Sequence, residues 1–239
     1  MSGVEGQSFR VSVVMPVWME AAGIAASLDA LQPLRAAGHE VIVVDGGSTD
    51  GTPELARPLC DRVLRSEPGR AVQMNAGAAV ATGNVLLFLH ADTQLPDNAV
   101  AWIEKAVNAG WVWGRFDVRL SGRHRMFPVI AWFMNRRSCL TGICTGDQAL
   151  FVRRDVFDAL GGYRNMPLME DVELSRRLLL VGRPSCVPAR VITDSRRWEQ
   201  GGVWRTIALM WRLRWRYWRG DSPESLAVLW RRNVRRAED

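Results

Sequence analysis

The strongest constraint on the fold lies in the first 95 residues, where three apolar runs each end at a polar cluster. The runs span residues 11–15, 41–44 and 85–89, and the clusters that follow them span 16–20, 45–50 and 90–92. Apolar runs that alternate with helical segments predict a mostly parallel sheet covered by helices on both faces. Ligands bind at the carboxyl ends of the strands in such sheets. The sequence therefore predicts an α/β domain whose site lies at one sheet edge.

The remaining segments are assigned from their hydrophobic spacing. Helices are expected at 21–34, 53–59, 73–81, 155–160 and 171–181, and further strands or extended segments at 62–65, 111–120 and 149–152. The last helix is clearly amphipathic. At 239 residues the chain fits one large domain, or one domain with an appendage.

The net charge of +6 arises from the C-terminal tail. Residues 196–239 hold 11 arginines and 5 acidic residues, whereas the preceding 195 residues hold 20 basic and 20 acidic ones. The tail also holds six of the eleven tryptophans. Such a segment suits anionic lipid headgroups or phosphate-bearing acceptors. No nucleic-acid-binding module surrounds it, so we expect no nucleic-acid partner.

The cysteines and the apolar runs predict the compartment. Cys60, Cys139, Cys144 and Cys186 form neither a CxxC pair nor a metal cluster, so we expect four free thiols. The first residues lack a basic segment followed by an apolar one, and no apolar run is long enough to cross a bilayer. The sequence predicts a cytoplasmic protein and leaves open an association with the inner membrane face.

Three polar motifs could carry chemistry. The segment 45–52 follows a strand and precedes a helix; it suits nucleoside binding, or equally a tight turn that caps the helix. His90 and Asp92 could flank a divalent cation, although a core histidine explains His90 as well. Glu170 and Asp171 open the helix at 171–181, where the helix dipole stabilises carboxylates and would keep a general base ionised.

Taken together, these motifs resemble those of family 2 glycosyltransferases with the GT-A fold. The match runs from residue 10 to about 200, through 16–20, 45–52, Gly69-Arg70 with Asn75, Gly77 and Gly83, then 90–92, 170–176 and 197–198. Three departures stand out. His90 replaces the usual first aspartate of the metal motif, Gly46 replaces a commonly acidic residue, and residues 195–198 only approximate the acceptor motif. The combination is similar to a small bacterial subgroup, some members of which are named for arsenosugar biosynthesis.

The resemblance implies a role for each matching residue. Asp171, beside Glu170, would deprotonate an acceptor hydroxyl, and inversion at the sugar carbon would follow. Asp92, with His90, would hold Mg²⁺ or Mn²⁺. The donor, a UDP- or GDP-type sugar, would be bound by Pro16, Glu20, Asp45, Ser48, Arg70, Asn75, Ala91 and Asp92. The acceptor side would comprise Gly146, Asp147, Gln148, Arg197 and Trp198.

The resemblance also implies a division of the chain. Residues 1–200 would form the GT-A domain, with a nucleotide-binding half at 9–95 and an acceptor half at 96–200, and residues 201–239 a helical tail. Two other functions stay open: a nucleotidyltransferase on a related sheet, and a membrane-surface interaction protein whose catalytic edge has decayed. The first would need a glycine-rich basic loop after the first strand, which residues 16–20 do not provide.

The tail presents two stripes at helical spacing within residues 203–219. Trp204, Ala208, Trp211, Trp215 and Trp218 form one, and Arg205, Arg212, Arg216 and Arg219 form the other. One interpretation is an interfacial helix on an anionic membrane. The favoured one is that the tryptophans pack on the domain, or on a second subunit in a homodimer, while the arginines face water.

Overall fold

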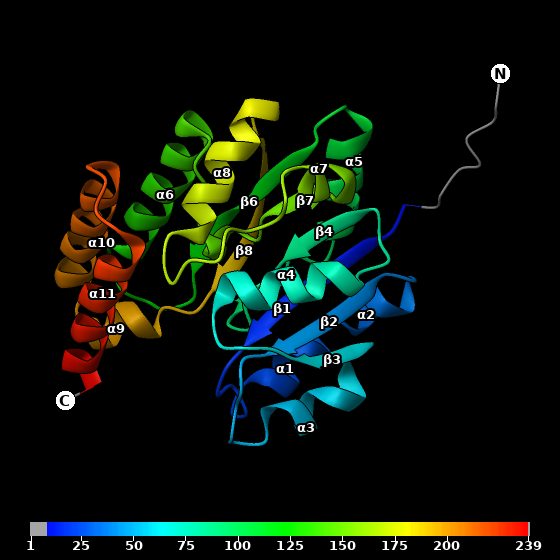
Figure 1. Ribbon diagram of the computed structural model, residues 1–239, viewed down its shortest axis with the longest axis horizontal. Helices are drawn as coiled ribbons and strands as arrows, with labels where there is room; N and C mark the ends of the chain where they lie inside the picture. The colour runs from blue at the N-terminus through cyan, green and yellow to red at the C-terminus, as the bar shows by residue number, and fades with distance from the viewer. Residues whose placement is uncertain (1–8, 239) are drawn as a thin grey trace.

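A computed structural model describes residues 9–238, and the side chains up to residue 233. Eight strands form one mixed sheet in the order β3-β2-β1-β4-β7-β6-β8-β5 (Figure 1). Their bounds are β1 Val11–Val17, β2 Glu40–Asp45, β3 Arg62–Arg65, β4 Val85–Phe88, β5 Thr93–Gln94, β6 Trp113–Leu120, β7 Phe151–Arg153 and β8 Ser185–Thr193. The first four strands are parallel, and β7 is antiparallel to both its neighbours.

The helices lie on both faces of the sheet and in the tail. Their bounds are α1 Ile24–Asp29, α2 Gln32–Ala36, α3 Thr52–Ala56, α4 Arg70–Val80, α5 Ala99–Asn108, α6 Phe127–Thr141, α7 Arg154–Ala159, α8 Glu170–Val181, α9 Arg196–Gly201, α10 Val203–Trp218 and α11 Pro223–Glu238. Two 3-10 turns, η1 Arg57–Leu59 and η2 Gly146–Gln148, complete the set. The predicted α/β class and GT-A-like arrangement of the sheet are confirmed.

Two hydrophobic clusters hold the helices against the sheet. Alternate side chains of β1 point to opposite faces, so Val13 belongs to the cluster under α1, α3 and α5, whereas Val14 belongs to the cluster under α4, α7 and α8. Gly77 lets α4 lie close to the sheet, because a Cβ there would collide with Val14 and Val44. The sheet edge that carries the polar clusters is therefore fixed by a rigid, fully covered core.

The helix expected at 21–34 is two short helices, α1 and α2. Pro33 lies in the first turn of α2, where its missing N–H costs nothing, and α1 has already ended at Asp29. Helices α5 and α6 and strand β8 were not predicted from the sequence.

The prediction of four free thiols is wrong for two of them. Cys139 on α6 and Cys186 on β8 form a disulfide, while Cys60 and Cys144 are free and buried. The two bonded cysteines are 47 residues apart, and their Cα atoms lie 5.8 Å apart. Only the packing of α6 beside β8 brings them together, so sequence spacing carried no signal.

The expectation that the tryptophan stripe packs on the domain is also wrong. Trp204, Trp211, Trp215 and Trp218 are all exposed, whereas the opposite face of α10 buries Val203, Thr206 and Leu213. Leu213 packs with Leu226 of α11 and with Val172 of α8. The aliphatic face is thus the one that holds the tail to the domain. Within residues 9–238, no helix combines the length and the apolar character needed to span a bilayer.

Candidate active site

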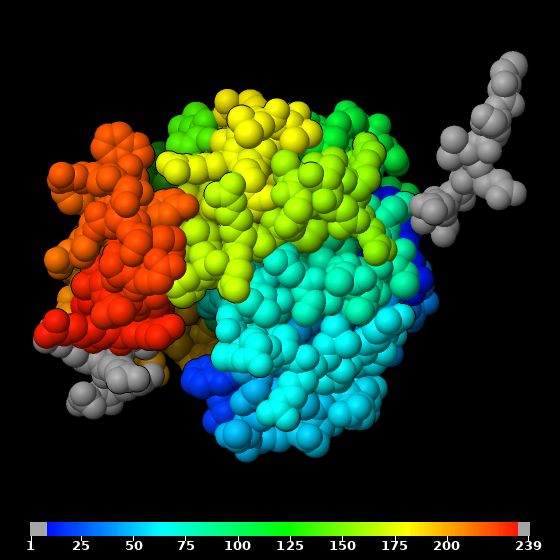
Figure 2. Space-filling model, viewed as in Figure 1, coloured from blue at the N-terminus to red at the C-terminus, as the bar shows by residue number. Residues whose placement is uncertain are grey.

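A pocket of about 250 Å³ lies between the sheet edge and the tail. One wall is acidic, with Glu20 after β1, Asp92 after β4, Asp147 on η2 and Asp194 after β8. The other wall is basic and comes from α9 and α10, with Arg196, Arg197 and Arg205. Figure 2 shows the surface hollowed between the tail, in red, and the blue segment that follows β1. A pocket with one acidic and one basic wall suits a ligand that carries both a cation and an anion.

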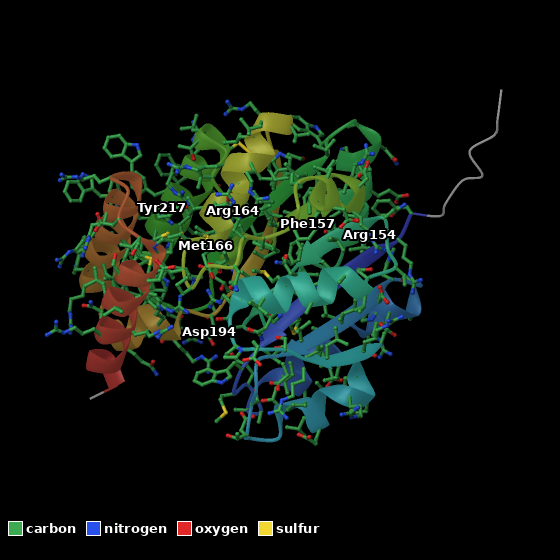
Figure 3. The ribbon with its side chains drawn as sticks, viewed as in Figure 1. Arg154, Phe157, Arg164, Met166, Asp194 and Tyr217 are labelled. Carbon is green, nitrogen blue, oxygen red and sulfur yellow. A yellow bond between two sulfur atoms is a disulfide. The ribbon has the colours of Figure 1, made fainter. Side chains whose placement is uncertain are left out.

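The acidic wall concentrates negative charge. Burial, and then the charge of Asp92, raises the pKa of Glu20 above its usual value, although Arg196 and Arg70 oppose the shift. The Asp92 carboxylate accepts a hydrogen bond from the Thr93 hydroxyl at 3.2 Å. The backbone carbonyl of Asp92 accepts a hydrogen bond from the N–H of Asp194. This bond ties the end of β4 to the end of β8. Asp194, labelled in Figure 3, lies on the segment that connects β8 to α9. A bound cation would relieve the repulsion between these carboxylates.

His90 is directed at Asp147. The imidazole Nδ1 lies 3.5 Å from the Asp147 Oδ1. Burial alone would raise the pKa of Asp147, but the hydrogen bond and charge of His90, together with Arg197 and Arg70, hold it well below its usual range. Asp147 therefore stays ionised and faces the main pocket, while His90 lines a second, much smaller one.

The second pocket contains the carboxylate pair that opens α8. Asp171 accepts hydrogen bonds from the N–H of Gly146 at 3.0 Å and of Val172 at 2.7 Å. Glu170 is buried, and burial followed by the charge of Asp171 raises its pKa. Asp171 is thus oriented by two backbone N–H groups beside the buried Glu170.

Turn η2 joins the two pockets, because Gly146 lines the smaller pocket and Asp147 lines the main one. Gln148 anchors the turn: its side chain is fully buried and donates to the Ser138 hydroxyl of α6 at 2.9 Å. Gly146 must lack a side chain, since a Cβ there would fall on the His90 imidazole.

Strained backbone marks the same segments. The described non-glycine residues with positive φ are Met19, Ala149 and Met169, at 55°, 47° and 70°. Each adjoins a site segment: Met19 precedes Glu20, Ala149 follows Gln148, and Met169 precedes Glu170. A strained backbone of this kind persists only where contacts with the surrounding structure hold it in place. Such residues cluster at functional sites.

Several sequence-predicted donor residues have other partners. Both oxygens of the buried Asp45 accept backbone N–H groups of its own loop, from Gly47 and Ser48. The Ser48 hydroxyl accepts the N–H of Met19, which braces the loop after β1. The side-chain amide of Asn75 donates a hydrogen bond to the backbone carbonyl of Tyr163 and accepts one from the Tyr163 N–H. These three side chains shape the loops around the pockets and line neither pocket.

Of the other predicted residues, Pro16, Ala91 and Arg70 also line neither pocket. Pro16 lies within β1, and the carbonyl of the buried Ala91 accepts the Ser27 hydroxyl. Arg70 begins α4, and its charge acts on Glu20, Asp147 and Glu170. Arg197 and Trp198, which the resemblance assigned to the acceptor side, line the main pocket.

The sequence did not single out several residues that line the main pocket. Asp194, Arg196, Trp230 and Asn233 are among them, and Arg205 was assigned only to the basic stripe. The guanidinium of Arg197 stacks over the Trp230 ring at 5.0 Å, so α11 supports the basic wall. The tail is therefore one side of the pocket rather than an appendage remote from it.

The sequence profile of "Glycosyl transferase family 2" matches residues 12–161. A "PGL/p-HBAD biosynthesis glycosyltransferase" of Mycobacterium bovis (strain BCG / Pasteur 1173P2) is 31% identical over 164 residues, which cover 64% of this chain and 62% of that protein. The chain thus matches less than two thirds of that relative's length.

Solved structures share the fold at lower identity. A mannosyltransferase from Pyrobaculum calidifontis, in complex with GDP-Man and Mn²⁺, superposes with a TM-score of 0.66 at 21% identity, covering 97% of this chain and 70% of that one. Glucosyl-3-phosphoglycerate synthase from Mycobacterium tuberculosis, with Mn²⁺, UDP and phosphoglyceric acid, gives 0.57 at 21% identity, covering 77% and 69%.

Proposed function

Because the chain belongs to glycosyl transferase family 2, we propose that it transfers a sugar from a nucleoside-diphosphate sugar to a hydroxyl acceptor, with inversion at the sugar carbon. One observation carries this proposal: turn η2 joins a pocket with one acidic and one basic wall to the Asp171 carboxylate, which the N–H groups of Gly146 and Val172 orient. Residues 1–200 are the transferase domain, and residues 201–239 are a tail that closes its pocket.

The donor occupies the main pocket with its diphosphate between the two walls. Arg196, Arg197 and Arg205 pair with the phosphate oxygens, since guanidinium groups match that geometry. UDP- and GDP-type donors both fit this arrangement, and solved structures of the same fold hold one or the other.

The acidic wall fits a hard divalent cation. Among the described residues there is no cluster of three or more histidine, cysteine or acidic side chains able to enclose a metal. Mg²⁺ and Mn²⁺ suit that situation, because Mg²⁺ in particular takes one or two carboxylates and completes its shell with substrate phosphates and water. Asp92 would hold the ion, and its charge would offset the charge that develops on the leaving diphosphate. His90 supports this wall through Asp147.

Asp171 acts as the general base. It removes the proton of the acceptor hydroxyl as that oxygen forms a bond to the sugar carbon, and the bond from this carbon to the diphosphate oxygen breaks on the opposite side. The nucleoside diphosphate leaves, and a single displacement inverts the configuration. Positioned base catalysis of this kind contributes about 10²–10⁴-fold.

A donor screen followed by product analysis tests the proposal. Thermal shifts with UDP, GDP, their sugars and the triphosphates UTP and GTP, each with and without Mn²⁺, should identify one nucleoside diphosphate or its sugar that stabilises the protein. NMR of the product made from that donor should then show the inverted anomeric configuration. Retention of configuration would refute a single displacement, and stabilisation by nucleoside triphosphates alone would favour a nucleotidyltransferase.

A further inference from the structure

Helix α10 exposes a row of large aromatic side chains. Trp204, Trp211, Trp215 and Trp218 are 68%, 73%, 55% and 73% exposed. Their spacing places them along one stripe of the helix. The buried positions Val203, Thr206 and Leu213 occupy the opposite face, so the stripe is turned away from the core. We call these four side chains the tryptophan face.

The neighbouring helix α6 adds a second exposed apolar row. It packs beside α10, with Phe127 and Ile130 in the same cluster as Val203 (Figure 1). The exposed apolar side chains of α6 are Val129, Trp132, Phe133 and Leu140, between 42% and 68% exposed. Exposed apolar surface on this scale marks an interaction site rather than ordinary solvent-facing surface.

Positive charge flanks the tryptophan face. Arg212 and Arg219 are exposed on the adjacent stripe of α10 and just after it, and the Arg219 guanidinium lies 4.7 Å from the Trp215 ring centroid. Residues 196–239 carry all of the chain's net positive charge. Tryptophan is favoured at the boundary between headgroups and acyl chains, and arginine pairs with the phosphates above it.

We propose that α10 is an interfacial helix: the tryptophan face enters the headgroup layer of an anionic lipid bilayer, and the flanking arginines pair with lipid phosphates. Charge complementarity selects this partner. A second copy of the chain would bring two arginine-rich surfaces together, and like charges repel. Because α10 also supplies Arg205, Thr206 and Leu209 to the main pocket, binding would hold that pocket at the membrane surface.

Flotation of the full chain with lipid vesicles tests the proposal. The wild-type protein should float with phosphatidylcholine vesicles that contain phosphatidylglycerol, and far less with phosphatidylcholine alone. Added salt should weaken the binding. The double variant Trp211→Ala, Trp215→Ala should lose most of it. Arg212→Gln and Arg219→Gln should each weaken it by about fivefold. All four side chains are solvent-facing, so the fold should persist, and the thermal unfolding midpoint checks this.

A matched control is Trp111→Ala, since Trp111 is also exposed but precedes β6, outside the tail. It should bind vesicles like the wild type. Equal loss with Trp111→Ala, or undiminished binding by the Trp211, Trp215 double variant, would overturn the proposal. So would sedimentation showing a dimer that the double variant dissociates, because the tryptophan face would then be a contact between copies. The assay needs no donor or acceptor, so its outcome is independent of the transferase activity.

Discussion

The Asp171 carboxylate accepts a hydrogen bond from the backbone N–H of Gly146 at 3.0 Å. This bond ties the start of α8 to turn η2, whose next residue, Asp147, faces His90. The proposed base and the acidic wall of the donor pocket are thus held by one short turn. Disturbing the turn should affect both.

Replacing the proposed base should separate chemistry from binding. We expect Asp171→Asn to lower the transfer rate by about 10²–10⁴-fold while donor affinity, measured by calorimetry, changes little. Glu170→Gln should be milder, because it is Asp171 that accepts the N–H of Gly146 in turn η2. Asp29→Asn, at an exposed position on α1, is the control. A parallel loss of rate and affinity in Asp171→Asn would argue against the base assignment.

Removing the proposed metal ligand should have an effect that depends on the metal. Asp92→Ala should weaken nucleoside-diphosphate binding chiefly when Mg²⁺ or Mn²⁺ is present, since the carboxylate acts through the cation. Titrations with and without the ion give the comparison, and Asp97→Ala, at an exposed position nearby, controls for lost charge. A loss of the same size without metal would assign Asp92 a structural role instead.

Adding one methyl group to turn η2 should disable the site. In Gly146→Ala the new Cβ would collide with the His90 imidazole, so either the turn or the histidine must move. Displacements of about 1 Å near reacting groups can cost about 100-fold in rate. Gly23→Ala is the control, because nothing lies within 4 Å of a Cβ there. Wild-type turnover in Gly146→Ala would show that the contact is unimportant.

Asp61 should stabilise the fold only where it is ionised. Burial alone would raise its pKa, but hydrogen bonds from Arg35 and from the N–H of Val41 lower it below its usual value. A carboxyl group whose pKa is lower in the folded protein than in the unfolded chain stabilises the fold at every pH above its unfolded-state pKa, which is about 4. That stabilisation is lost as the pH falls through the folded-state pKa. Asp61→Asn should therefore reduce the free energy of unfolding in urea at pH 7 and make little difference near pH 2. A pH-independent difference would contradict this account.

Local sequence determined much of the fold. The runs at 11–15, 41–44 and 85–89 predicted three parallel strands, because a strand buried on both faces must be apolar along its length. Polar residues directly after those runs then had to meet at one sheet edge. Asp92 and Glu20 accordingly share a pocket, and Asp171 lies where its helix begins.

Only the tertiary structure decided which side chains face the pockets. Asp45 was expected to bind the donor, yet its carboxylate folds back onto the N–H groups of Gly47 and Ser48. Asp147 contacts His90, and Cys139 bonds Cys186, across separations of 57 and 47 residues. The helical spacing of residues in α10 predicted a tryptophan stripe and an arginine stripe. The packing of Leu213 against α8 and α11 decided that the tryptophans point outward. Hydrophobic periodicity is a local property, whereas side-chain direction depends on contacts between segments far apart in the chain.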